Sequence, residues 1–97
     1  DEALIEVALD LSGRPYVVVD LPFGEVLALG SPPFNPEMAE HFLVSFATSA
    51  AITLHVTKRG GTNTHHIIEA TFKGLARTLR DAVGVEGVGV PSTKGTL

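Results

Sequence analysis

Two stretches near the start of the chain have patterns of apolar residues that are typical of strands. Residues 3–10 alternate loosely between apolar and polar positions, and residues 16–21 are mostly β-branched and apolar. Each segment is therefore a predicted strand. The segment between them, Ser-Gly-Arg-Pro at 12–15, has the composition of a turn. We therefore expect the two strands to pair as a hairpin, with a short third strand at residues 26–29.

A later stretch has the helical spacing of apolar residues and a recognisable start. Asn35 can cap a helix, Pro36 fits its first position, and Glu37 favours the positive end of the helix dipole. The pattern predicts a helix to about residue 50. Its spaced positions are Met38, Phe42, Ser45, Phe46 and Ser49.

The next element has the strictest alternation in the chain. Residues 51–57 are a predicted strand, with a loop at 58–62. His55 would face away from the apolar side, so we interpret it as a surface histidine. The apolar face comprises Ile52, Leu54 and Val56.

A second helix is predicted from about residue 63 to residue 83, ended by Gly84. Its predicted buried stripe comprises Ile68, Phe72, Leu75, Ala76 and Leu79. The order of elements is then β-β-β-α-β-α. This order predicts one α+β domain over residues 1–97, with its helices on one face of a mixed sheet.

The charge and the hydrophobic content of the chain argue against some functions and favour others. Seven Lys and Arg against eleven Asp and Glu give a net charge of −4, which argues against nucleic acid as a partner. A chain of 97 residues that is 44% hydrophobic and has no Cys has apolar surface to spare, which predicts association with other copies. With no basic leader and no apolar run long enough to span a membrane, we expect a cytoplasmic protein.

The second helix carries the candidate chemistry. His65 and Glu69 are four residues apart and His66 and Glu69 three apart, so either pair can face one ion. Lys73 lies about 12 Å from His65 along the helix axis at 1.5 Å per residue. Imidazole and carboxylate donors without thiolate suit Mn, Fe, Zn or Ni. The alternative is that two adjacent histidines are only exposed polar residues near a helix start.

Two further sets of residues could contribute to such a site. His41 lies early in the first helix, and packing of the two helices would bring it near the others; alone, it is more often structural. The segment Pro91-Ser92-Thr93-Lys94-Gly95 offers hydroxyls, an ammonium and backbone N–H groups for a phosphate. Its spacing is not that of a Walker loop, and an unstructured tail is the alternative.

Several motifs together resemble one family. The chain is similar to the second half of imidazoleglycerol-phosphate dehydratase, an enzyme of histidine biosynthesis. The resemblance covers the whole chain in order, and its most specific motifs are His65-His66-Ile67-Ile68-Glu69 and Pro91-Ser92-Thr93-Lys94-Gly95. It implies that the chain is one of two similar halves, each resembling the second domain of ribosomal protein S5. It also implies a large shell of subunits with paired Mn²⁺ sites between them.

The family's reaction removes water from imidazole glycerol phosphate to give imidazole acetol phosphate, with Mn²⁺ binding the imidazole ring. By resemblance, the metal ligands are His41, His65, His66 and Glu69. Glu69 and His65 are the implied catalytic residues. Lys73, Ser92 and Lys94 would face the phosphate, whereas the arginines that grip it in the family belong to the absent first half.

Three hypotheses follow from these observations. The first is a Mn²⁺-dependent lyase half-domain that needs the first half for full activity. The second is a catalytically inactive, metal-binding half-domain that assembles with copies of itself. The third, an RNA-binding domain, rests on the S5-like fold alone, and the net charge of −4 argues against it.

Overall fold

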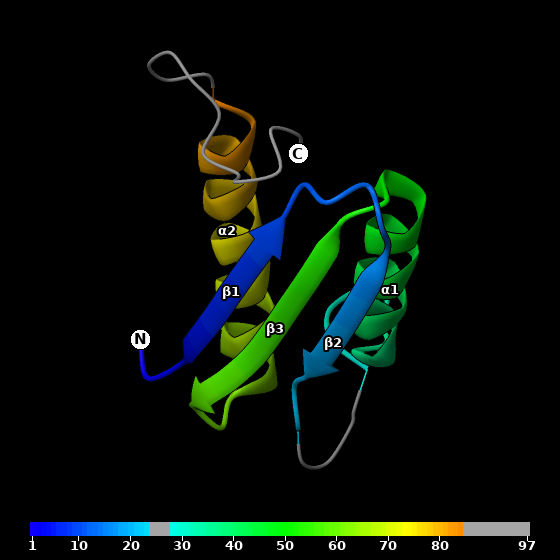
Figure 1. Cartoon of the computed structure of the whole chain (residues 1–97). Helices are drawn as coiled ribbons and strands as arrows, with labels where there is room; N and C mark the ends of the chain where they lie inside the picture. Colours follow the sequence, from blue (N-terminus) through cyan, green and yellow to red (C-terminus); the bar gives the residue numbers. More distant parts are fainter. Residues whose placement is uncertain (24–27, 85–97) are drawn as a thin grey trace.

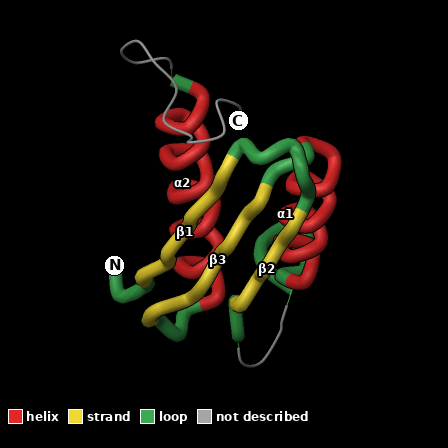
Figure 2. The backbone as a smooth tube through the Cα atoms, viewed as in Figure 1, coloured by secondary structure: helices red, strands yellow, loops and turns green. Residues whose placement is uncertain are grey.

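One three-stranded sheet with two helices on one face makes up the structure (Figures 1 and 2). The computed structural model describes residues 1–23 and 28–84. The elements in chain order are β1 (Leu4–Asp10), β2 (Tyr16–Asp20), α1 (Glu37–Ala50), β3 (Thr53–Gly60) and α2 (Thr64–Val83). The α+β class and the helices on one face are therefore confirmed. Within the described residues, neither helix is long and apolar enough to cross a membrane.

The strand order corrects the predicted hairpin. β3 lies between the other two strands, antiparallel to β1 and parallel to β2. The connection from β1 to β2 instead crosses the end of β3, where Ser12 Oγ lies 3.0 Å from Thr53 Oγ1. β3 is the central strand. It is the longest of the three, and its apolar side chains are fully buried, as is typical of a strand that pairs on both sides.

β3 also extends further than the sequence predicted. The predicted loop at 58–62 is wrong for its first three residues, which continue the strand to Gly60. The polar composition there is satisfied by long-range contacts: Arg59 forms an ion pair with Glu6 at 2.7 Å, and Lys58 Nζ donates to the carbonyl oxygen of Pro22 at 2.9 Å. Cross-strand pairing, which the local composition does not reveal, decides where this strand ends.

Residues 26 and 27 of the third predicted strand, 26–29, lie outside the described residues. Leu29 itself forms an isolated antiparallel bridge with Phe34. This bridge precedes α1, which begins at Glu37, so Pro36 lies at the N-cap position and not at the predicted first helical position. The side chain of Asn35 accepts a hydrogen bond from the backbone N–H of Glu37 at 3.0 Å.

The core lies between the sheet and the helices, and the helices face it through residues other than those predicted. α1 buries Ala39, Leu43 and Ala47, whereas Met38 and Phe42 are 49% and 47% exposed. Two alanines on the inner face let the helix backbone approach the sheet closely, so the larger side chains are displaced to its flank. The predicted stripe of α1 is therefore wrong by about one position.

The buried stripe of α2 is displaced by one position in the opposite direction, toward the start of the helix. Its fully or nearly buried side chains are Ile67, Thr71 and Leu75, so only Leu75 of the predicted stripe lies in the core. The hydroxyl of Thr71 donates to the carbonyl oxygen of Ile67 at 2.8 Å, which satisfies a polar group in an apolar layer. Phe72 instead lies on the side of α2 that meets α1, with its ring centroid 5.4 Å from that of Phe42.

Candidate functional site

The start of α2 carries the candidate ligands, as the sequence predicted. Asn63 caps the helix, and its side-chain oxygen accepts from the backbone N–H of His66 at 3.0 Å. The cap fixes the phase of the first two turns of α2, on which His65, His66 and Glu69 lie. All three lie outside the buried stripe of the helix, so their polar atoms are available to bind a ligand.

Three side chains form a line along α2. His65 Nε2 lies 3.4 Å from Glu69 Oε2, and Lys73 Nζ lies 2.7 Å from Glu69 Oε1. The hydrogen bond and the charge of Lys73 lower the pKa of Glu69 below its usual value, with a smaller contribution from His65. The order of imidazole, carboxylate and ammonium inferred from spacing is thus observed in the structure.

His66 faces a different group, the acidic start of the chain. Its Nδ1 lies 3.1 Å from Glu2 Oε2, and its Nε2 lies 3.4 Å from Asp1 Oδ2. The other oxygen of Glu2 accepts from the backbone N–H of Asn63 at 3.0 Å. This backbone hydrogen bond is the main reason that the pKa of Glu2 is lowered, and the His66 ring adds to it.

Sequence reasoning missed Glu2 and Asp1 as neighbours of this site. Glu2 is separated from His66 by 64 positions along the chain, and no spacing rule connects residues so far apart. The only local signal was a pair of acidic residues directly before a predicted strand.

Two cavities adjoin these side chains, one on each side of Glu69. The first, of about 150 Å³, is lined by Asp1, Ala3, His66, Glu69, Ala70 and Lys73. The second, of about 390 Å³ and mostly apolar, is lined by Leu29, Gly30, Phe34, His65, Ile68 and Glu69. Glu69 therefore reaches both spaces, while each histidine borders only one.

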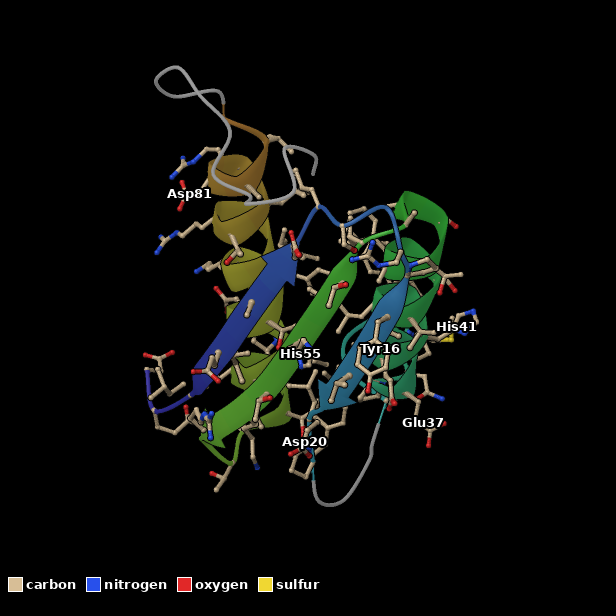
Figure 3. The ribbon with its side chains drawn as sticks, in the orientation of Figure 1. Tyr16, Asp20, Glu37, His41, His55 and Asp81 are labelled. Atoms are coloured by element: carbon tan, nitrogen blue, oxygen red, sulfur yellow. The ribbon has the colours of Figure 1, made fainter. Side chains whose placement is uncertain are left out.

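His41 does not join this group within one chain. It is exposed on α1 and points outward from that helix, away from the sheet (Figure 3). Over residues 1–23 and 28–84, no three His, Asp or Glu side chains are gathered closely enough to hold a metal ion. The structure thus brings together His65, Glu69 and Lys73, whereas His66 on the same helix faces Glu2 and Asp1, and Ser92 and Lys94 lie outside the described residues.

His55 lies on the open face of the sheet, as expected for a surface histidine. Its ring is exposed, and its centroid is 6.0 Å from that of Tyr16 (Figure 3). The sheet separates this pair from the helices, so His55 takes no part in the group on α2.

Known proteins resemble this chain in sequence and in fold. The sequence pattern described as imidazoleglycerol-phosphate dehydratase matches residues 1–79. The dehydratase of Carboxydothermus hydrogenoformans is 53% identical over 97 residues, which are 100% of this chain and 49% of that protein. The dehydratase of Methanopyrus kandleri is 50% identical over the whole chain and 48% of its own length.

Solved structures give the same result. The dehydratase of Staphylococcus aureus superimposes with a TM-score of 0.82 at 36% identity, covering 89% of this chain and 49% of that one. The enzyme of Pyrococcus furiosus, solved in complex with (S)-C348, has a TM-score of 0.81 at 37% identity and matches 100% of this chain and 52% of its own. The chain thus spans about half the length of the curated relatives it matches.

Proposed function

This chain belongs to the imidazoleglycerol-phosphate dehydratase family, and we propose that it is a half-domain of a Mn²⁺-dependent dehydratase in histidine biosynthesis. The proposed reaction removes water from imidazole glycerol phosphate and gives imidazole acetol phosphate. The observation that carries this proposal is the group of two imidazoles, a carboxylate and an ammonium on the first three turns of α2.

The donor atoms of this group suit the proposed metal. His65 and His66 offer imidazole nitrogens and Glu69 offers a carboxylate, a set that fits Mn²⁺ and also admits Zn²⁺ or Ni²⁺. His41 would complete the set from a second copy, because its side chain points away from the core of its own chain (Figure 3). When bound, the cation would stabilise negative charge that develops on the imidazole ring of the substrate.

The remaining roles follow from charge and protonation. A glutamate carboxylate is ionised at neutral pH, and Lys73 lowers the pKa of Glu69 further; in the proposal this carboxylate accepts a proton from the substrate. In the proposal His65, whose Nε2 lies 3.4 Å from Glu69 Oε2, is the second catalytic residue beside Glu69. Lys73 has three N–H donors, and those not engaged with Glu69 would bind the substrate phosphate together with Ser92 and Lys94.

The proposal also requires other chains. The chain matches about half of the length of its relatives, and α1 exposes the apolar side chains of Met38 and Phe42. Burying such side chains against a second half-domain is favourable at about 25 cal/mol per Å². We therefore propose a homo-oligomer of half-domains, in the form of a large shell, that works in the cytoplasm and reaches full activity with the missing first half.

A second candidate is a half-domain that binds metal and assembles but does not catalyse the reaction. The exposed apolar side chains of α1 support assembly in this alternative as they do in the first, so the two candidates share the metal and the oligomer and differ only in catalysis.

The two candidates differ in turnover. We would measure dehydration of imidazole glycerol phosphate in Mn²⁺ by this chain alone and after mixing with a first-half chain of a relative. Recovery of activity on mixing supports the dehydratase half-domain. No activity in either case, with Mn²⁺ bound, supports the inactive alternative.

Metal content tests the proposed ligands directly. His65→Ala and Glu69→Ala should each lower the Mn²⁺ bound per chain, measured by elemental analysis after gel filtration. His55→Ala is the matched control, because that histidine is exposed on the opposite face of the sheet. Equal metal content in all four proteins would rule out the ligand assignment.

A further inference from the structure

One carboxylate joins the start of the chain to both the backbone and a side chain of α2. Glu2 Oε1 accepts from the backbone N–H of Asn63 at 3.0 Å, and Glu2 Oε2 lies 3.1 Å from His66 Nδ1. An ionised carboxylate can only accept hydrogen bonds. Nδ1 of His66 must therefore carry the ring proton in this contact, which leaves Nε2 unprotonated in the neutral ring.

The backbone holds Glu2 in this position. The start of β1 and the turn before α2 lie side by side at the same end of the sheet (Figure 1). Gly61 in that turn has φ +111°, and a Cβ added there would lie 2.7 Å from the Cα of Ala3. Only a glycine allows this approach, and the approach places the residue before Ala3 over the helix start.

Asp1, the other acidic neighbour of His66, does not accept a hydrogen bond of ordinary length from the ring. Asp1 Oδ2 lies 3.4 Å from His66 Nε2, which is longer than an ordinary N–H···O hydrogen bond of about 2.7–3.2 Å. The backbone N–H of His66 is held by Asn63. His66 is thus fixed at its main chain by the helix cap and at its ring by Glu2.

We infer that Glu2 is a positioning residue for His66: it fixes the ring orientation and the tautomer in which Nε2 is free to bind a divalent cation. The inference rests on the proposed metal-binding function of α2. Carboxylates that bind the second ring nitrogen of a metal-ligating histidine act in this way, and their loss typically weakens metal binding about 10–100-fold.

The test compares Glu2→Gln, Glu2→Ala and the unchanged chain. A glutamine has an NH₂ group in place of one carboxylate oxygen, so it cannot keep the observed arrangement in which each oxygen of Glu2 accepts one of the two hydrogen bonds. We would record ¹⁵N spectra of the imidazole rings in the metal-free protein at pH 8, where an ordinary imidazole is neutral. We expect the Nδ1–H tautomer of His66 to dominate in the unchanged chain and to lose its dominance in both variants. The Mn²⁺ dissociation constant, measured by calorimetry, should rise about 10–100-fold in both.

Glu6→Gln is the matched control, because it removes a carboxylate from the same segment that instead pairs with Arg59. It should leave the His66 tautomer and the Mn²⁺ affinity unchanged. An unaltered tautomer in both Glu2 variants, with their far-UV spectra unchanged, overturns the inference. A tautomer change in a chain that binds no Mn²⁺ supports the positioning role of Glu2 and counts only against the proposed metal site.

Discussion

The ring of Phe42 on α1 lies against the ring of Phe72 on α2, with centroids 5.4 Å apart and planes tilted by 56°. Phe42 also stacks on Phe46 of its own helix at 5.9 Å. These contacts join the two helices beside the core and not within it, since Phe42 remains 47% exposed. The same side chain therefore contributes to stability and leaves apolar surface for a second chain.

Replacing Phe42 by alanine tests both contributions. We expect Phe42→Ala to lower the free energy of unfolding by about 1–2 kcal/mol, from the lost aromatic contacts and partial burial. It should also shift the sedimentation coefficient toward that of smaller species. Val44→Ala, on the same helix and 37% exposed, is the control and should cost less than about 1 kcal/mol. Equal effects of the two changes would contradict the role of the Phe42–Phe72 contact.

Gly61 should tolerate no side chain. Gly61→Ala combines an unfavourable φ of +111° with a Cβ 2.7 Å from the Cα of Ala3, and we expect a loss of about 2–4 kcal/mol in urea unfolding. Gly13→Ala separates the two causes, because Gly13 has φ +73° with nothing within 4 Å of the added Cβ. That change should cost about 1–2 kcal/mol. A cost for Gly61→Ala no larger than that for Gly13→Ala would show that the contact with Ala3 is not limiting.

Lys73 should control the ionisation of Glu69. Because Lys73 is the largest cause of the lowered pKa of Glu69, Lys73→Met should raise that pKa toward or above the ordinary value of 4.5. A lowered carboxyl pKa stabilises the fold above the unfolded value, and this contribution is lost as the pH falls through the folded value. As the pH falls from 5 through the titration of Glu69, the free energy of unfolding of Lys73→Met should therefore decrease less than that of the unchanged chain.

The measurement for this prediction is a ¹³C titration of the Glu69 carboxyl. Lys58→Met is the control, because the Lys58 ammonium binds the carbonyl oxygen of Pro22 and not Glu69. It should leave the Glu69 titration where it is. An unchanged Glu69 pKa in Lys73→Met would show that the ion pair at 2.7 Å does not persist in solution.

Thr71 offers a test of polarity in the core. Its hydroxyl donates to the carbonyl oxygen of Ile67, which also accepts the regular backbone hydrogen bond of the helix. Thr71→Val leaves that carbonyl paired and keeps the volume, so its cost should be below about 1 kcal/mol. Thr71→Ser keeps the hydroxyl and removes a fully buried methyl group, which should cost about 1–1.5 kcal/mol. Urea unfolding that ranks the two in the opposite order would show that the hydroxyl matters more than the packing.

Local patterns predicted the elements well where a single period persisted. The alternation around Leu54 and Val56 predicted β3, and the helical spacing from about residue 63 with Gly84 at its end predicted the limits of α2. The same spacing rules placed His65, His66 and Glu69 on neighbouring turns, because residues three and four apart on a helix lie on one face. These features depend on residues close together in the chain.

Other features depended on residues far apart in the chain. The sequence of α1 offers more than one apolar face. In the structure the face with Ala39 and Ala47 is buried, whereas Phe42 contacts Phe72 of α2. The sequence of the helix alone does not show which face is buried. Strand order is of the same kind, because any two alternating segments can pair and only the assembled sheet selects β3 as the centre. Backbone hydrogen bonding between distant segments decides this, and no single segment encodes it.

The sequence by itself determined the α+β class, the length of α2 and the order of imidazole, carboxylate and ammonium along it, because each follows from local periodicity. Only the tertiary structure decided that Glu2, 64 positions away, holds the ring of His66, and that His41 faces away from this group (Figure 3). The reason is physical: packing β1 against β3 brings the start of the chain to the start of α2, and that closeness exists only after the sheet has formed.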